Sequence, residues 1–443
     1  MKFDPISNRL SLRIAKQWLY RELLSYEEAG RLTQEQLCGL QRSRLEALCR
    51  HAKKHSPYYQ ELISDELLNS SFTESSQFLA ELPLLTKTLI TENYPSLVIE
   101  IENQNNIKKS TGGSTGKPFC FELDYASYIK REAVMWRGYG WAGYNYGQRA
   151  LYLWGVDSGV SGVKKRIKDT LYHRFYNRKM LNSFAMNEHN MGDYVESINQ
   201  YKPTIIVSYV NPILTLAQYI LDNNIQIRTP KRILTGAEPL HEFQREIIQK
   251  AFGCKVMNTY GCREFMLIGA ECSQQNGLHI NSDHLVVETV NESGESVVDE
   301  EGDIVITDLF NYGMPLIRYK NGDRAILSSR KCPCGNPFPL IEKITGRKLD
   351  SLRSPNGSIL PGEFFPHLLK DIKAIKQFQV IQNRLEEIEM SVVLAHPLSQ
   401  PDRDHIQQEL DRYTDGSLTL SILIVDDIAL TASGKYRVTI CKL

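Results

Sequence analysis

"STGGSTGKPF" (residues 110–119) is the stretch that decides the fold of this chain. Three glycines, four hydroxyl residues and one lysine within ten positions are typical of a loop that holds phosphate with backbone N–H groups and an ammonium. The stretch is not a P-loop that opens a helix, because Thr111 stands where that motif needs glycine and Pro118 follows the lysine. Proline ends a helix, so we expect the chain to return into a strand at "FCFELD" (119–124). Taken alone, the stretch also fits a flexible Gly/Ser turn.

The composition is that of an ordinary globular protein, and it narrows the choice of partners. The chain has 443 residues, 42% of them hydrophobic, and its 52 Lys and Arg balance 52 Asp and Glu. Balanced charge argues against a nucleic-acid-binding protein. The stretch "MKFDPISNRL" has no secretory apolar region, and no apolar run approaches the ~18 residues that span a membrane. We therefore expect a cytoplasmic protein without a membrane partner, whose nine cysteines are thiols or metal ligands.

Short apolar runs and helical stretches alternate through the middle of the chain. Helical periodicity covers residues 8–66 before this region begins. Buried strands are expected at 149–156, 203–209, 231–238 and 254–261, with helices at 211–223 and 240–252. Such alternation predicts an α/β fold with mostly parallel strands flanked by helices, and functional loops at the carboxyl ends of the strands. Antiparallel strands are expected at 301–310 and 315–327, and a small α+β domain from about 350 onward.

Five further motifs follow the opening stretch along the chain. They are "TGAEPL" (235–240), "NTYGCREF" (258–265), "RYKNGD" (318–323), "TGRKLDSL" (345–352) and "LTASGKYR" (430–437). With residues 110–118, these motifs resemble in type and order those of the adenylate-forming (ANL) superfamily. The resemblance is strongest to its phenylacetate–CoA ligase-like branch, and there to members found in capsule and polysaccharide gene sets.

The resemblance covers essentially the whole chain and implies two domains. A large N-terminal adenylation domain is expected over residues 1–345, including the helical segment 8–66 and a metal-bearing segment 271–335. A small mobile α+β lid domain is expected over 346–443. Its hinge departs from the family pattern, since Leu349 stands where relatives carry aspartate or lysine, and Asp350 follows. This leaves open whether the lid completes a second rotation for thioester formation.

The same resemblance implies an ATP site built from the loop and the strand ends. The expected nucleotide-binding residues are Ser110, Thr111, Gly112, Gly113, Ser114, Thr115, Gly116, Lys117, Gly236, Ala237, Glu238, Pro239, Tyr260, Gly261, Asp323 and Arg347. The loop residues should hold the β- and γ-phosphates, and Asp323 the ribose hydroxyls. Residues 237–239 should line the adenine while Tyr260 stacks on it.

Two residues receive catalytic roles from the resemblance. Glu264 is expected to bind Mg²⁺ together with ATP oxygens and water, because a hard cation prefers oxygen ligands. Lys435 is expected to bridge the substrate carboxylate and the α-phosphate as negative charge develops there. Without the motifs, a glutamate at a strand end or a lysine near the C-terminus would be an ordinary solvated side chain.

A cysteine–histidine set lies outside these motifs. "ECSQQNGLHI" (271–280) supplies Cys272 and His279, and "RKCPCGNPF" (330–338) supplies Cys332 and Cys334. Three sulfurs and one imidazole match a closed structural zinc site. Buried thiols beside an unrelated histidine are the alternative.

The leading functional hypothesis is an ATP-dependent, AMP-forming carboxylate ligase that passes its acyl group to a thiol, with coenzyme A as the expected acceptor. The substrate is a small carboxylic acid, an aryl acid among the candidates. One alternative transfers the acyl group to an amine or hydroxyl in polysaccharide or natural-product biosynthesis. Another is a non-enzymatic zinc-containing binding module on a relic adenylation fold. The identity of the acid, the use of a carrier protein as acceptor, and the oligomeric state, a homodimer included, stay open.

Overall fold

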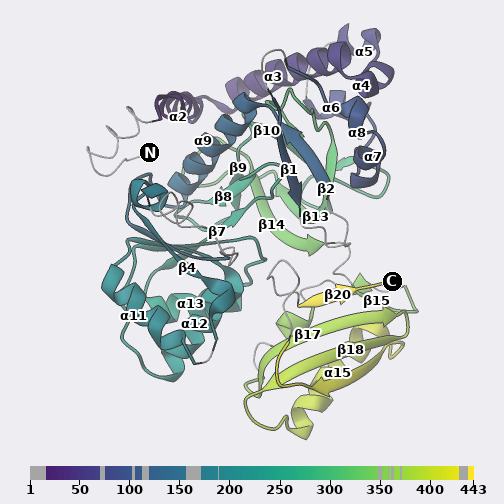
Figure 1. Cartoon of the computed structure of the whole chain (residues 1–443). Coiled ribbons are helices and arrows are strands. Elements are labelled where there is room, and N and C mark those ends of the chain that lie inside the picture. Colours follow the sequence, from purple (N-terminus) through teal and green to yellow (C-terminus); the bar gives the residue numbers. More distant parts are fainter. Residues whose placement is uncertain are drawn as a thin grey trace. The chain divides into compact units, whose positions relative to one another are not determined.

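The computed structural model describes most of the chain and divides it into two compact units (Figure 1). It describes residues 16–69, 75–101, 105–111, 119–155, 171–187, 189–347, 352–357, 359–360, 364–369, 372–428 and 438–443. The large unit comprises residues up to 321 together with 325–343. The small unit comprises residues 322–324 and 344–443.

Helices form the first part of the large unit. They are α2 (Gln17–Ala29), α3 (Gln34–His55), α4 (Pro57–Leu62), α5 (Asp65–Asn69), α6 (Ser75–Ala80), α7 (Lys87–Glu92) and α8 (Tyr94–Leu97). Helix α3 begins at a capping box, in which Thr33 and Gln36 satisfy each other's backbone N–H groups. It ends where Pro57 starts α4, because proline suits the first turn of a helix but not its interior. Thr86 caps α7 through the N–H of Leu89.

A two-stranded hairpin carries the ends of the opening stretch. Strand β1 (Ile107–Thr111) pairs antiparallel with β2 (Phe119–Leu123). The chain therefore returns into a strand after the glycine-rich loop, as Pro118 predicts. Helix α9 (Tyr125–Trp141) follows directly, and the carboxylate of Asp124 caps it by accepting from the N–H of Ser127 at 2.8 Å.

One twelve-stranded sheet forms the centre of the large unit, in the order β11-β10-β12-β13-β14-β9-β8-β7-β6-β5-β3-β4. Its parallel part comprises β3 (Ala150–Trp154), β4 (Arg178–Asn182), β5 (Ile205–Tyr209), β6 (Arg232–Gly236) and β7 (Lys255–Tyr260). The other strands are β8 (Gly269–Glu271), β9 (Leu278–Ile280), β10 (Leu285–Val290), β11 (Ser296–Val297), β12 (Glu301–Asp308), β13 (Tyr319–Ser328) and β14 (Leu340–Arg347). The four strands expected in the parallel region are all present.

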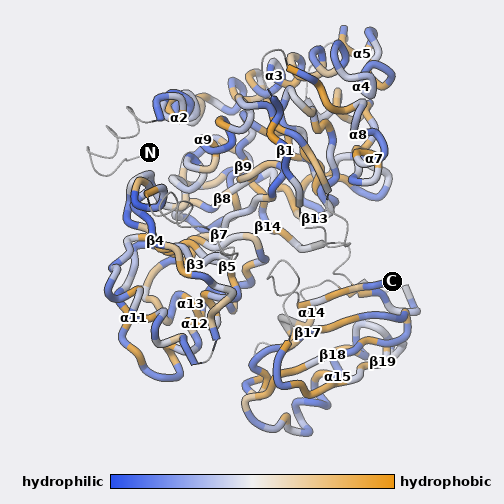
Figure 2. The backbone as a smooth tube through the Cα atoms, in the orientation of Figure 1, coloured by the Kyte–Doolittle hydropathy of each residue, from blue (hydrophilic) through white to orange (hydrophobic). Residues whose placement is uncertain are grey.

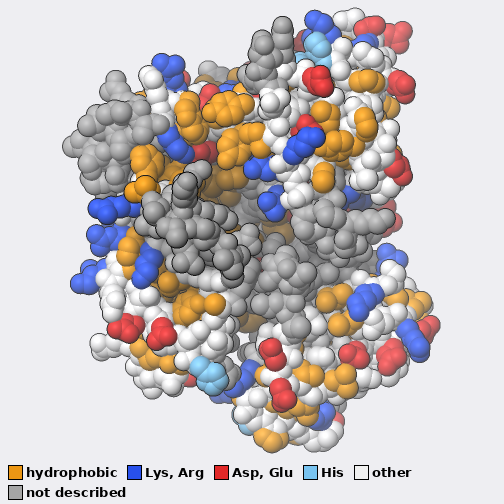
Figure 3. Space-filling view, in the orientation of Figure 1, with side chains coloured by type: hydrophobic (Ala, Val, Ile, Leu, Met, Phe, Trp, Pro, Cys, Tyr) orange, Lys and Arg blue, Asp and Glu red, His pale blue; other side chains and the backbone are white. Residues whose placement is uncertain are grey.

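Helices cover both faces of the parallel strands. Helices α2 and α9 pack against one face, with the buried Trp136 at the centre of that core. Helices α11 (Met191–Tyr201), α12 (Val210–Asp222) and α13 (Glu242–Phe252) contribute to the core on the other face. Figure 2 shows the consequence, with hydrophobic residues along the strands and hydrophilic residues on many outer turns. Both signs of charge occur across the face seen in Figure 3, with hydrophobic side chains between them.

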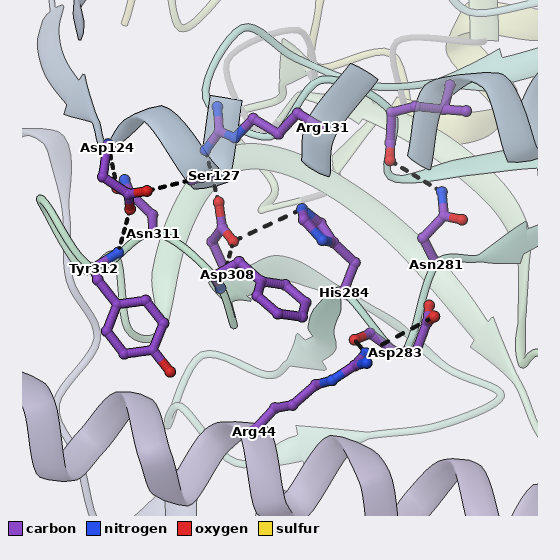
Figure 4. A network of polar contacts seen from close by, with 12 residues as sticks. Arg44, Asp124, Ser127, Arg131, Asn281, Asp283, His284, Asp308, Asn311 and Tyr312 are labelled. Carbon is purple, nitrogen blue, oxygen red and sulfur yellow. Dashed lines mark hydrogen bonds and ion pairs between the residues drawn. The ribbon is translucent and has the colours of Figure 1, made fainter. Parts of the chain in front are cut away.

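A buried charge network links α9 to Asp308 at the end of β12 and to Asp283 in the loop before β10 (Figure 4). The guanidinium of Arg137 donates to both carboxylate oxygens of Asp283, at 2.5 and 2.8 Å. That of Arg131 donates to Asp308 at 2.7 Å. His284 lies between them, fully buried, with Nε2 3.8 Å from an Asp308 oxygen. Burial lowers the pKa of His284 to about 4, against the attraction of Asp308, so the imidazole is neutral at pH 7.

The small unit is an α+β domain with its own core. Its strands are β15 (Leu352–Arg353), β16 (Ile359–Leu360), β17 (Ile375–Arg384), β18 (Glu387–Leu394), β19 (Thr419–Ile424) and β20 (Thr439–Cys441), and its helices are α14 (Phe364–Leu369) and α15 (Gln400–Thr414). The sheet order is β19-β18-β17-β20. Leu410 of α15 is buried among Val380 of β17 and Met390 of β18. Across the described ranges of both units, no helix combines the length and the apolar character that crossing a bilayer requires.

Candidate functional site

The carboxyl ends of the parallel strands form one edge of the sheet, and several expected site residues gather there. Strand β6 ends at Gly236 and leads into Ala237, Glu238 and Pro239. Its neighbour β7 ends at Tyr260 and leads into Gly261 and Glu264. Ligands in α/β sheets bind outside this edge. The structure thus brings "TGAEPL" (235–240) and "NTYGCREF" (258–265) to the same edge of the sheet.

Three of the nine described non-glycine residues with positive φ lie in or beside these motifs. Ala237, Met266 and Arg318 all have positive φ, at 66°, 65° and 53°, although none is glycine. Such conformations cost free energy and persist where the surrounding structure enforces them, often at functional sites. At Gly261 the backbone passes so close that an added Cβ would lie 1.9 Å from the Met266 carbonyl oxygen. Only glycine fits there, which explains its place after the tyrosine.

Glu264 and Tyr260 are buried and each is contacted from β13. The Glu264 side chain is 4% exposed, and its Oε1 accepts a hydrogen bond from the Tyr319 hydroxyl at 3.1 Å. The Tyr260 hydroxyl accepts from Nδ2 of Asn321 at 2.8 Å. Asp323 lies two residues further along β13, after Gly322 with φ of 92°. These contacts join "NTYGCREF" to "RYKNGD", which are far apart in the sequence.

The glutamate of "TGAEPL" has a role that the motif alone does not reveal. An oxygen of Glu238 accepts from the N–H of Asn211 at 2.8 Å, in the first turn of α12. A carboxylate there satisfies an unpaired backbone donor and interacts favourably with the helix dipole. The Glu238 side chain therefore links the segment after β6 to α12, and the nucleotide contact expected of residues 237–239 stays a prediction.

Two aromatic rings at the same edge were not among the expected site residues. Trp154 ends β3 and Tyr209 ends β5, and their rings stack with centroids 4.0 Å apart. Burial, followed by the negative charge of Glu238, raises the pKa of the Tyr209 hydroxyl. Their place at the ends of two predicted strands was the available signal, because that is where a parallel sheet binds its ligands.

Several expected residues lie outside the described ranges. These are Gly112, Gly113, Ser114, Thr115, Gly116, Lys117, Leu349, Asp350 and Lys435. Ser110 and Thr111 end β1, and Arg347 ends β14. Their roles in nucleotide binding and catalysis stay predictions.

The cysteine–histidine set comes together in space. The donor atoms of Cys272, His279, Cys332 and Cys334 all lie within 4.8 Å of one another. The Cys272 and Cys332 sulfurs are 3.6 Å apart, and the Cys334 sulfur is 3.3 Å from Nε2 of His279. A tetrahedral zinc ion with bonds of about 2.3 Å to sulfur and 2.0–2.1 Å to nitrogen sets neighbouring donors roughly 3.6–3.8 Å apart. The donor set fits such an ion.

The surroundings of this cluster also suit a metal. Nδ1 of His279 lies 3.1 Å from the Phe338 carbonyl oxygen, a contact that orients the ring and points Nε2 at the sulfurs. Burial lowers the pKa of His279, which favours the neutral, ligating form. Burial raises the pKa of Cys272 to about 12, so a proton must leave that thiol when a cation binds.

A buried ion pair joins the cluster to the strand that carries the nucleotide motif. Glu271, directly before Cys272, accepts from Arg245 of α13 at 2.8 and 3.0 Å. The same carboxylate accepts from the N–H of Asn258 in β7 at 2.6 Å. No motif marks this pair, and its charges give no periodic signal. Cys272 directly follows β8, which pairs with β7, the strand that ends at Tyr260. His279 lies in β9, the next strand of the sheet.

Comparison with known proteins finds relatives along most of the chain. A family model described as the CapK C-terminal domain matches residues 352–442. Protein CapK of Staphylococcus aureus is 27% identical over 439 residues, covering 94% of this chain and 92% of CapK. The phenylacetate–coenzyme A ligase of Thermus thermophilus is 26% identical over 394 residues, covering 84% of each chain.

Solved structures share the fold. The crystal structure of 2-hydroxyisobutyryl-CoA ligase with 2-HIB-AMP has a TM-score of 0.75 at 17% identity, covering 94% of this chain and 92% of the ligase. The α/β architecture with its small C-terminal domain is thus that of the adenylate-forming ligases. Along most of its length the chain is thus similar to CapK and to phenylacetate–coenzyme A ligases. Its structural neighbours are adenylate-forming coenzyme A ligases, whose fold it shares.

Proposed function

We propose that this protein is an AMP-forming carboxylate–coenzyme A ligase. The observation that carries the proposal is the junction at the carboxyl edge of the sheet. There a buried carboxylate, Glu264, and a buried tyrosine, Tyr260, are held by the strand that continues to Asp323. Relatives named as acid–coenzyme A ligases along most of the chain support the same activity. These ligases favour an enzyme over a non-enzymatic zinc-containing module.

The first half-reaction makes the carboxylate reactive. One carboxylate oxygen attacks the α-phosphorus of ATP, a new P–O bond forms, and pyrophosphate leaves. Two anions must approach each other, so positioning and charge neutralisation lower the barrier. Glu264 would hold Mg²⁺, which neutralises phosphate charge. Asp323 would accept from the ribose hydroxyls, and Lys435 would stabilise the negative charge shared by the carboxylate and the α-phosphate.

The second half-reaction transfers the acyl group. The sulfur of coenzyme A attacks the carbonyl carbon of the adenylate, a thioester bond forms, and AMP leaves while the thiol proton is lost. An amine or hydroxyl acceptor would follow the same balance and give an amide or ester. The hinge carries Leu349 where relatives have aspartate or lysine, and this difference is compatible with an amine or hydroxyl acceptor.

The acid is proposed to be aromatic. Trp154 and Tyr209 place two stacked rings beside the carboxyl edge, next to the segment that follows β6. Aromatic faces favour flat apolar partners in stacked or edge-on contact. The phenylacetate ligases among the relatives act on an acid of this kind. Aliphatic acids, such as the one named for the structural neighbour, are the competing class.

We propose further that the cysteine–histidine cluster binds one structural zinc ion. Three thiolates and one imidazole complete a tetrahedron and leave no ligand position for a substrate. Zinc would then stabilise the β8–β9 region and the 332–338 loop without taking part in the acyl chemistry.

The products of single turnovers test the ligase proposal. ATP labelled in the α-phosphate is mixed with the full chain, Mg²⁺ and one acid at a time, with and without coenzyme A. We expect acid-dependent AMP, and release of a thioester only when coenzyme A is present. Accumulation of ADP would rule out adenylation. Adenylate that reacts with hydroxylamine or lysine but never with coenzyme A would favour the amine-acceptor alternative.

A further inference from the structure

Strand β13 contacts the nucleotide site at two successive inward positions, and neither contact has an assigned role. We propose that Tyr319 and Asn321 are positioning residues. Tyr319 holds the Glu264 carboxylate in place for its cation, and Asn321 holds the Tyr260 ring for the adenine. This inference rests on the proposed function and deepens it, because it separates metal binding from nucleotide binding within one strand.

The position of the Tyr319 hydroxyl is strongly determined. Its side chain is fully buried and its ring packs against Phe265, with centroids 5.8 Å apart. The backbone on either side is anchored to Leu85, which donates to the Arg318 carbonyl and accepts from the Lys320 N–H, both at 2.9 Å. A hydroxyl held in this way can select one rotamer of Glu264. Its hydrogen bond goes to Oε1 and does not consume Oε2, which stays suited to a cation.

Asn321 is the next residue on the same face of β13 and makes a comparable contact. Side chains two residues apart in a strand share a face, and both Tyr319 and Asn321 contact the segment that ends β7. The Asn321 side chain is 4% exposed, and its amide donates to the Tyr260 hydroxyl at 2.8 Å. The asparagine of this chain places an N–H donor at the tip of the ring.

The alternation stops after these two residues, which limits the arrangement to them. Gly322 has φ of 92°, a conformation that glycine adopts readily and other residues do not. Asp323 follows directly and lies in the same strand. Tyr319 positions Glu264, the proposed Mg²⁺ ligand, and Asn321 positions Tyr260, which is proposed to stack on the adenine. Mutating one of the two should therefore leave the function of the other intact.

Two conservative variants of the full chain test the separation. In Tyr319→Phe we expect the Mg²⁺ concentration for half-maximal pyrophosphate exchange to rise about five- to twentyfold, because a hydrogen bond to a charged group is lost. The ATP KM at saturating Mg²⁺ should change less than twofold. In Asn321→Ala we expect the reverse, a three- to tenfold higher ATP KM with an unchanged Mg²⁺ midpoint.

Tyr59→Phe is the matched control. Tyr59 is also buried; its hydroxyl donates to the Pro315 carbonyl at 2.9 Å and accepts from the Ile317 N–H at 3.2 Å, and neither bond involves Glu264. This variant should lose a comparable amount of stability and leave both the Mg²⁺ midpoint and the ATP KM unchanged. A double-mutant cycle adds a readout that a merely structural role would not produce: in a Glu264→Gln background, Tyr319→Phe should have no further effect on the Mg²⁺ midpoint.

The outcomes distinguish this inference from the proposed function. Wild-type protein that binds ATP and exchanges pyrophosphate, with an unchanged Mg²⁺ midpoint in Tyr319→Phe, overturns the positioning role of Tyr319 alone. The role is also overturned if Tyr319→Phe and Tyr59→Phe shift the Mg²⁺ midpoint and the ATP KM by the same amounts, because equal shifts indicate general destabilisation. Wild-type protein that neither binds ATP by calorimetry nor exchanges pyrophosphate overturns the proposed function, and this inference with it.

Discussion

Replacement of Cys334 by serine removes one of the four donors of the proposed zinc site. The cluster joins segments that are distant in the sequence, since Cys272 and Cys332 are 60 positions apart. A link that closes a loop of this length restricts the unfolded chain by roughly 4 kcal/mol in the chain-entropy treatment of cross-links. That is comparable to the total stability of a domain, about 5–15 kcal/mol. We therefore expect Cys334→Ser to lower the melting temperature of the large unit by roughly 5–10 °C.

Metal content and thermal unfolding are measured on the same preparations. Wild-type protein, purified without added metal, should contain one zinc per chain, and Cys334→Ser should contain much less. A chelator should lower the melting temperature of wild type but not that of the variant. Cys254→Ser is the matched control, because Cys254 is a partly buried thiol outside the cluster. It should keep its zinc.

Activity decides between a structural and a catalytic zinc. The Cys334→Ser protein that remains folded should still form acyl-adenylate, because the four donors leave no open position for a substrate. Folded wild-type protein with a zinc content near zero would refute the site. Folded Cys334→Ser that loses adenylation while retaining its melting temperature would refute the structural role.

Three further predictions concern the catalytic residues and the buried charges. Lys435→Ala should lower the rate of adenylate formation about 10²–10³-fold while ATP affinity, measured by calorimetry, stays within a few-fold. Glu264→Gln should raise the Mg²⁺ requirement sharply, because the amide keeps the shape but loses the charge; a magnesium titration equal to wild type would contradict this. His284 titrates near pH 4 in the fold, below its usual value of about 6.5, so the unfolded chain binds its proton first as the pH falls. The free energy of unfolding should therefore drop by about 3 kcal/mol between pH 6.5 and pH 4, and urea titrations of His284→Gln should lack this component.

Local patterns in the sequence were sufficient for most of the fold. Apolar runs bounded by glycine and polar residues predicted the strands ending near Tyr209, Gly236 and Tyr260, and Pro118 predicted the return into β2. These features depend on residues close together in the chain. The sequence pattern also changes near residue 350, and the structure has a separate small α+β unit that comprises residues 344–443 and 322–324.

Contacts between distant segments were beyond such patterns. The bond from Tyr319 to Glu264 depends on how β13 and the loop after β7 meet, and no spacing in the sequence encodes that meeting. The Glu238 cap on α12 was missed for the same reason, since Asn211 lies in another segment. The clustering of Cys272, His279, Cys332 and Cys334 was predictable, because three cysteines and a histidine can be identified as a set without knowing the path of the chain between them. Zinc binding at this cluster stays a prediction.

Carboxylate-dependent exchange between ATP and labelled pyrophosphate tests the central proposal most directly. Exchange requires that the chain form an acyl-adenylate reversibly, and it does not depend on knowing the final acceptor. Across a panel of aromatic and aliphatic acids, we expect exchange with at least one aromatic acid and none without an acid, and exchange about 10²–10³-fold slower in Lys435→Ala. Folded, zinc-loaded wild-type protein that binds MgATP and yet shows no acid-dependent exchange with any member of the panel would contradict a carboxylate-activating enzyme.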